Sequence, residues 1–144
     1  MVPSLPCRTV PSSSDIICLL DDEPSVLRSL GRLLASEGLT ALKFADPPSF
    51  LRYAGSHPVR LAVVDIRMPG MTGIDVLEEL RVLSPDTRTI IMTGESDAIH
   101  RTAALAAGAV SFFLKPFDDE AFLQAVRAVM VRPPWVAGEN RGDG

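Results

Sequence analysis

The chain has 144 residues, of which 47% are hydrophobic and 22% are charged, and its formal net charge at pH 7 is −4. This composition fits one ordinary globular domain, and the lack of a Lys/Arg-rich run predicts no direct nucleic-acid binding. No apolar stretch approaches the roughly 20 residues of a membrane helix, and residues 1–15 lack the positive-then-apolar order of a signal peptide. We therefore expect a cytoplasmic protein that makes no membrane contact.

Short apolar runs alternate with helical patterns along the chain. Residues 1–14 are rich in proline and serine and are predicted to be a flexible extension. Strands are predicted at residues 16–20, 39–45, 61–65, 88–94 and within 110–117. Helices are predicted to follow them, beginning at Pro24, within 46–58, after the Pro69–Gly70 turn, over 96–107 and at Asp118. Residues 133–144 are predicted to be a flexible tail, which leaves 15–132 as the domain.

Strict alternation of strands and helices indicates the fold class. Parallel strands need crossover connections, so the pattern predicts an α/β domain with a doubly wound, five-stranded parallel sheet and five helices on both faces. The helix that follows the Pro69–Gly70 turn is predicted to pack through Val76, Leu80 and Leu83. In such a sheet, ligands bind outside the carboxyl ends of the strands.

Polar residues stand at the carboxyl ends of four predicted strands: Asp21 and Asp22 after the first, Asp65 after the third, and Thr93 and Lys115 at the ends of the fourth and fifth. Each has an ordinary structural interpretation, such as an acid at a helix start or a lysine at the surface. Because parallel strands end along one edge of the sheet, however, we expect all of these side chains to meet in one crevice.

Several carboxylates in one crevice repel each other unless a cation neutralises them. Hard oxygen ligands suit Mg²⁺ or Mn²⁺. No Cys/His cluster offers a zinc or copper site, since His57 and His100 are isolated in the sequence. The pattern therefore predicts a divalent cation beside Asp65.

The segments that carry these residues resemble a known family. LLDDE, VVDIRMPGMTG, IIMTG and FFLKPF, in this order, are similar to the receiver domains of two-component response regulators, the CheY-like superfamily. The resemblance covers about residues 15–132, and DIRMPGMTG with MTG and KPFD is most similar to FixJ-type regulators. It implies a flavodoxin-like sheet with the strand order 2-1-3-4-5.

The resemblance also implies a phosphoryl-transfer role. Asp65 would be the phosphoacceptor, modified by a sensor histidine kinase or a phosphotransfer protein. Lys115 and Thr93 would contact the phosphoryl oxygens, and the Lys115–Pro116 bond would be cis. Phosphoryl transfer requires positioning and cations around the equatorial oxygens more than acid–base catalysis, which agrees with the residue types present.

For the metal, the resemblance implies a set of oxygen ligands. Asp22 would bind Mg²⁺ directly, together with Asp65, and Asp21 would act mainly through a metal-bound water. The backbone carbonyl of Arg67 would supply a further ligand.

Four residues around the site are expected to modulate it. Phe112 matches the aromatic residue that moves inward in this family when Thr93 approaches the phosphate; without a tyrosine hydroxyl its switch would depend on packing, and an ordinary core role is the alternative. Gly94 leaves room for a kinase histidine or an attacking water. Arg67 and Glu95 either pair across the phosphate and slow its hydrolysis or are independent solvated charges.

The leading hypothesis is a stand-alone phosphorylatable signalling domain that is not an enzyme, apart from slow loss of its own phosphate. The alternatives are a fragment of a longer regulator, an aspartyl-phosphate phosphohydrolase and an unphosphorylated, receiver-like interaction module. A phosphohydrolase of the haloacid-dehalogenase type would need a second Asp where Arg67 stands. The downstream effector is not readable from the sequence, and a homodimer could form through the fourth helix, fifth strand and fifth helix.

Overall fold

The computed structural model describes residues 15–94 and 99–130. In chain order they form β1 (Ile17–Leu20), α2 (Pro24–Ala35), β2 (Ala41–Phe44), α3 (Pro47–Ser56), β3 (Leu61–Asp65), α4 (Gly73–Leu83), β4 (Arg88–Gly94), α5 (Arg101–Ala106), β5 (Ser111–Lys115) and α6 (Asp119–Met130). The predicted extension at 1–14 and the predicted tail at 133–144 lie outside the described residues.

The five strands form one parallel sheet in the order β2-β1-β3-β4-β5. The predicted fold class and strand order are therefore confirmed. The chain first moves from β1 outward to β2 and then returns past β1 to β3, so the strand order reverses between β1 and β3. In open parallel sheets, this reversal is where a crevice for ligands opens at the carboxyl ends.

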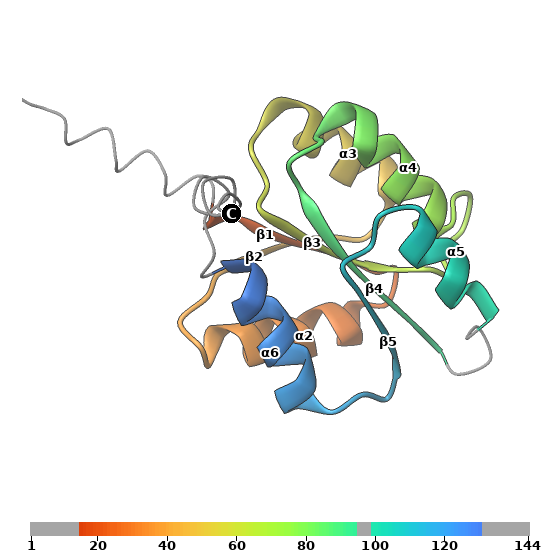
Figure 1. Ribbon diagram of the computed structural model, residues 1–144. Helices are drawn as coiled ribbons and strands as arrows, with labels where there is room; N and C mark the ends of the chain where they lie inside the picture. Colours follow the sequence, from red (N-terminus) through yellow and green to blue (C-terminus); the bar gives the residue numbers. More distant parts are fainter. Residues whose placement is uncertain (1–14, 95–98, 131–144) are drawn as a thin grey trace, which may run out of the picture.

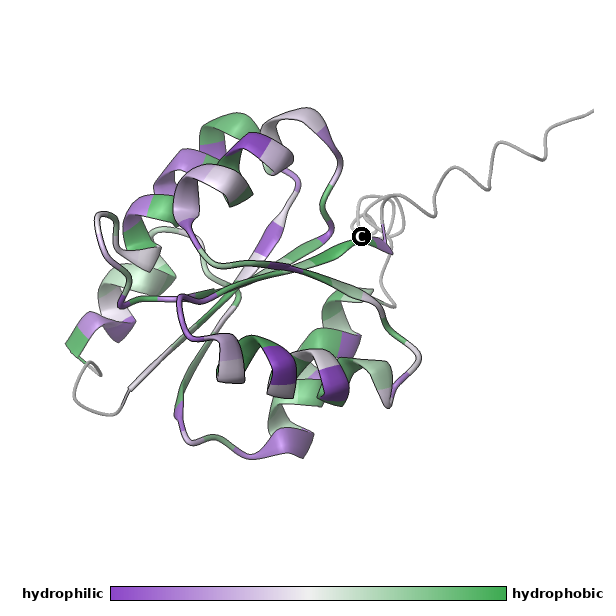
Figure 2. Ribbon diagram, turned by 180° about the vertical axis from the view of Figure 1, so that it is seen from behind, coloured by the Kyte–Doolittle hydropathy of each residue, from purple (hydrophilic) through white to green (hydrophobic). Residues whose placement is uncertain are grey.

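Helices cover both faces of the sheet. Figure 1 shows α3, α4 and α5 on one face and α2 and α6 on the other. Side chains alternate along β3, so Leu61 and Val63 pack in the cluster of α2 and α6, while Ala62 and Val64 pack in the cluster of α3, α4 and α5. Burial on both faces explains why this strand reads as an uninterrupted apolar run. The helices, in contrast, carry hydrophilic as well as hydrophobic residues (Figure 2).

Several helices begin with the residues that the chemistry of helix ends favours. Pro24, which has no N–H to leave unpaired, is the first residue of α2. The Thr72 hydroxyl accepts the N–H of Asp75 at 3.1 Å, and the Asp75 carboxylate accepts the N–H of Thr72 at 3.1 Å. The Asp118 carboxylate accepts the N–H of Ala121 at 2.8 Å, which confirms the predicted start of the last helix. A cap of this kind stabilises a helix by about 1 kcal/mol.

Two details differ from the sequence prediction. Of the helix predicted over 96–107, residues 96–98 lie outside the described residues, and the structure has α5 at Arg101–Ala106, where no side chain caps the start at His100. Leu83, predicted to pack with Val76 and Leu80, is 43% exposed. Leu83 is the last residue of α4, and Ser84 caps the helix after it. Leu77 is buried together with Val76 and Leu80 instead.

Candidate functional site

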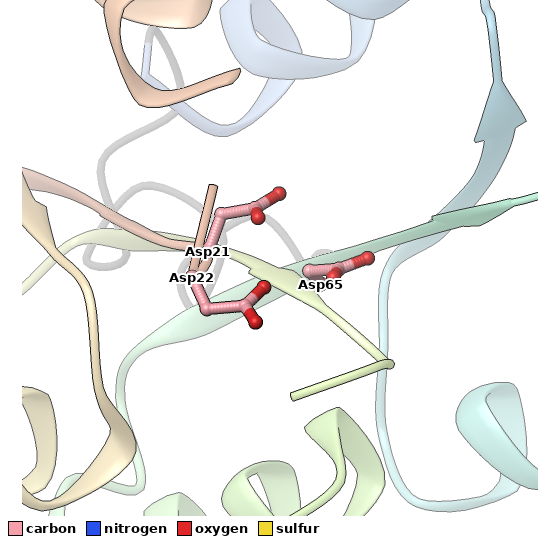
Figure 3. A group of neighbouring side chains, drawn as sticks. All are labelled: Asp21, Asp22 and Asp65. Carbon is pink, nitrogen blue, oxygen red and sulfur yellow. The ribbon is translucent and has the colours of Figure 1, made fainter. Parts of the chain in front are cut away.

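The acidic residues gather at the carboxyl edge of the sheet, as predicted. Asp21 and Asp22 follow β1, and Asp65 is the last residue of the neighbouring strand β3 (Figure 3). Asp21 is 0% exposed and Asp65 is 5% exposed, whereas Asp22 is exposed to solvent. One carboxylate oxygen from each of the three lies within 4.8 Å of the others. This is the one group of its kind found among the described residues.

The donor set of these three side chains fits a hard divalent cation. It consists of carboxylate oxygens alone, without the His or Cys ligands that zinc and copper prefer. Two of the carboxylates are buried and one faces solvent, so an ion here would keep part of its hydration shell, as Mg²⁺ usually does. The acidic cluster is thus chemically suited to Mg²⁺ or Mn²⁺.

Lys115, at the end of β5, reaches into the same cluster. Its Nζ donates a hydrogen bond to Asp21 Oδ2 at 3.1 Å and lies 3.4 Å from Asp65 Oδ1. The other oxygen of Asp21 accepts the backbone N–H of Glu23 at 2.9 Å, and the Asp21 N–H donates to the Phe44 carbonyl at 3.2 Å. Three hydrogen bonds therefore hold Asp21 in place, and the ammonium group of Lys115 bridges it to Asp65.

Burial and neighbouring charges shift the ionisation of the site. Desolvation, with a smaller contribution from the negative charge of Asp21, raises the pKa of Asp65 to about 6, although Lys115 opposes the shift. Burial of the Lys115 ammonium disfavours its charge, but the carboxylates of Asp65 and Asp21 outweigh burial and raise its pKa. The ammonium remains protonated, while Asp65 is ionised at neutral pH at a cost in free energy that a further cation would offset.

The backbone of Asp65 is held by a close approach of α4 that the sequence prediction missed. A Cβ added to Gly73 would lie 2.6 Å from the carbonyl oxygen of Asp65 and 2.9 Å from Ile66 Cα, so only glycine fits here. The Gly73 N–H donates to the Ile66 carbonyl at 3.0 Å, and the Ile66 N–H donates to the Met92 carbonyl at 3.0 Å. Glycine as the first residue of a helix was the available signal, since it is a poor helix former.

The remaining predicted residues occupy the neighbouring strands. Thr93 is buried in β4, and Gly94 follows it; apart from its chain neighbours, no atom of the described residues lies within 4 Å of where its Cβ would be. Phe112 in β5 is 8% exposed, and Arg101 Cζ lies 5.7 Å from the centre of its ring. The Lys115–Pro116 peptide bond is cis, as the resemblance implied.

Arg67 lies in the β3–α4 loop, two residues beyond Asp65, and is exposed to solvent. It lines a cleft beside the site together with His100, a residue to which the sequence prediction gave no role. Glu95, the predicted partner of Arg67, lies outside the described residues.

Comparison with known sequences identifies one matching family and several similar proteins. A profile of the response regulator receiver domain matches residues 17–127. Response regulator protein TodT of Pseudomonas putida is 35% identical over 133 residues, which cover 90% of this chain and 59% of that protein. Transcriptional regulatory protein FixJ of Azorhizobium caulinodans is 37% identical over 114 residues, which cover 79% of this chain and 54% of that protein. The chain thus spans somewhat over half the length of these curated relatives.

Solved structures show the same architecture. A CheY-like response regulator receiver domain protein from Methanospirillum hungatei superposes with a TM-score of 0.74 at 26% identity, over 90% of this chain and 98% of that chain. The beryllofluoride-activated NtrC4 receiver domain dimer superposes with a TM-score of 0.76 at 26% identity, over 81% of this chain and 97% of that chain.

Within the residues that the structure describes, no helix is long and apolar enough to cross a membrane.

Proposed function

The chain belongs to the response regulator receiver domain family, and on this premise we propose that Asp65 accepts a phosphoryl group from the histidine of a sensor kinase or phosphotransfer protein. The observation that carries the proposal is the bridge of Lys115 Nζ to Asp21 and Asp65, at 3.1 and 3.4 Å, beside the exposed carboxylate of Asp22. Residues 94 positions apart in the sequence are thereby joined around one buried carboxylate.

The proposed reaction is an in-line displacement at phosphorus. An oxygen of Asp65 forms a bond to phosphorus while the bond between phosphorus and the histidine nitrogen breaks, and its electron pair remains on the imidazole. The ammonium of Lys115 stays beside Asp65 and neutralises charge on the equatorial oxygens. The Thr93 hydroxyl, at the adjacent end of β4, would donate a hydrogen bond to one of these oxygens.

Mg²⁺ or Mn²⁺ would be held directly by the carboxylates of Asp22 and Asp65 and the backbone carbonyl of Arg67, and by Asp21 mainly through a metal-bound water. When bound, such an ion supplies charge neutralisation for the incoming phosphoryl group. Asp22 is the exposed member of the set, so it would take the ion from solution, whereas Asp21 is fixed by Lys115 and the Glu23 N–H. The two acids after β1 therefore have different tasks.

Phosphorylation would be read out through β5 and the helices beside it. Phe112 packs under α5, and we propose that its position responds when Thr93 moves toward the phosphate. A Phe112→Ala variant that is phosphorylated and still couples normally to its effector would remove this role. Ile99, Leu105 and Val110 are exposed apolar residues at α5 and β5, and the related NtrC4 receiver domain is a dimer when activated. A homodimer through α5, β5 and α6 is therefore proposed as one output.

Neither alternative function gains support from the site. A phosphohydrolase of the kind considered above would need a carboxylate where Arg67 stands, and Arg67 offers no general acid or base. An interaction module without phosphorylation would have no use for a buried acid cluster that costs free energy.

The proposal is tested by incubating the protein with acetyl phosphate and Mg²⁺ and measuring its intact mass. The wild type should gain one phosphoryl group, whereas Asp65→Asn should gain none, because the amide lacks a nucleophilic oxygen. Asp86→Asn, at an exposed loop position between α4 and β4, is the matched control and should be phosphorylated normally. A wild type that stays unmodified, or an Asp65→Asn variant that is modified equally, would contradict the proposal.

A further inference from the structure

A cleft of about 460 Å³ opens next to the residues that follow Asp65 in the chain. It is lined by Ile66, Arg67, Met68, Pro69, Thr72 and His100, which come from the β3–α4 loop and the residue before α5. Ile66 follows Asp65 directly, and Arg67 is two residues beyond it. Because two residues of extended chain span at most about 7 Å, both cleft residues lie close to Asp65. The cleft is therefore within reach of a group attached to a phosphorus atom at Asp65.

The acidic cluster and the cleft differ in charge. Asp21, Asp22 and Lys115 gather at Asp65 and carry an excess of negative charge. The six described residues that line the cleft include one guanidinium and one imidazole but no carboxylate. An anion that departs from phosphorus would be repelled by the acids and attracted toward Arg67 and His100.

The walls of the cleft add a second kind of chemistry. Ile66 is buried and Met68 is half-buried, so next to the two basic groups the cleft presents apolar surface. A short organic carboxylate combines an anionic end with a small apolar body and matches both features. The volume suits a small molecule of this class.

We propose that this cleft is the leaving-group subsite for small acyl phosphates, and that His100 makes the domain select them as phosphodonors. The inference rests on the proposed function of Asp65. An Asp65 oxygen forms a bond to phosphorus, the bond between phosphorus and the acyl oxygen breaks, and the electron pair leaves on the carboxylate. No proton is transferred, so the cleft needs only to bind an anion. His100 donates a hydrogen bond to that carboxylate.

Two phosphodonors with different leaving groups distinguish an effect on leaving-group binding from an effect on phosphoryl transfer itself. Acetyl phosphate releases acetate, which fits the subsite, whereas phosphoramidate releases ammonia, which has neither negative charge nor a carbon body. Initial rates of phosphorylation would be measured by intact mass with saturating Mg²⁺ for the wild type, His100→Ala, His100→Gln and His57→Ala. His57, the other histidine of the chain, stacks on Tyr53 at 4.1 Å after α3 and serves as the matched control.

His100→Ala should slow the reaction with acetyl phosphate about 2- to 10-fold, the range for loss of one hydrogen bond, and leave the phosphoramidate rate unchanged. His100→Gln, which keeps a donor, should retain more of the acetyl phosphate rate, and His57→Ala should change neither. Equal losses with both donors, or no change with either, would overturn the subsite, and so would a wild type that reacts with phosphoramidate alone. A wild type that reacts with neither donor would instead contradict the role of Asp65.

Discussion

The raised pKa of Asp65 makes a prediction about folding stability that can be tested without any phosphodonor. In the folded protein, burial raises this pKa from its ordinary value of 3.8 to about 6. The folded state therefore binds a proton more tightly than the unfolded chain does. The stabilisation from the protonated form is fully present below pH 3.8 and is lost as the pH rises through about 6.

The size of this loss follows from the two pKa values. Their difference corresponds to about 3 kcal/mol, of which about 2 kcal/mol should be lost between about pH 4.5 and pH 7.5. Asp65→Asn cannot ionise at this position, so its stability should not contain this loss. We therefore expect the variant to gain about 2 kcal/mol relative to the wild type over that pH range.

The measurement is urea unfolding of both proteins in a chelating buffer at several pH values, followed by circular dichroism. Asp86→Asn, which removes an exposed carboxylate, is the control and should follow the wild type at every pH. A stability difference between Asp65→Asn and the wild type that does not depend on pH would refute the reasoning. It would mean that Lys115 compensates the buried charge fully. Added Mg²⁺ should stabilise the wild type near neutral pH more than the variant, because it favours the ionised carboxylate.

Three further predictions concern residues around this site and in the core. Thr89→Val should raise the free energy of unfolding by about 1 kcal/mol in urea, because its buried hydroxyl has no hydrogen-bond partner among the described residues; a loss of stability would contradict this. Gly73→Ala should cost about 1–3 kcal/mol of stability and, under the proposed function, slow phosphorylation of Asp65, since its methyl group would meet the Asp65 backbone. Gly94→Ala, whose methyl group would meet no described atom, should leave stability unchanged. If Arg67 and Glu95 pair over the phosphate, Arg67→Ala and Glu95→Ala should each shorten its lifetime, and unchanged lifetimes would reject the pair.

The placement of the site residues at one edge of the sheet was predictable because it follows from parallel strand pairing. Strands that are buried on both faces read as apolar runs, and parallel strands share one carboxyl edge. Once β1, β3 and β5 were recognised, Asp21, Asp65 and Lys115 could be placed along the same edge, although β5 is not adjacent to β1 or β3 and the contact depends on the reach of the Lys115 side chain. The strand order itself came from the resemblance and is confirmed by the pairing of β1 with both β2 and β3.

What the sequence could not predict depends on the distance between elements. Gly73 matters because the start of α4 approaches the Asp65 carbonyl, a contact set by how the helix packs on the sheet. The role of His100 depends in the same way on where the chain enters α5, and no capping side chain in the sequence defines that point. Leu83 fits the helical period of its neighbours but lies beyond the region that α4 buries, so periodicity alone assigned it wrongly.

The charges of the site favour a divalent cation beside Asp65. Three carboxylates face one ammonium group, so the described cluster carries a net charge of about −2 once Asp65 is ionised. Under the proposed function, phosphorylation would replace the carboxylate of Asp65 by a group of about −1.5 to −2 charge, which would increase this excess. Lys115 cannot supply more charge, and Asp21, being 0% exposed, gains little from solvent. A doubly charged ion at Asp22 is the remaining source of neutralisation, so the modified state should bind the cation more tightly than the unmodified one.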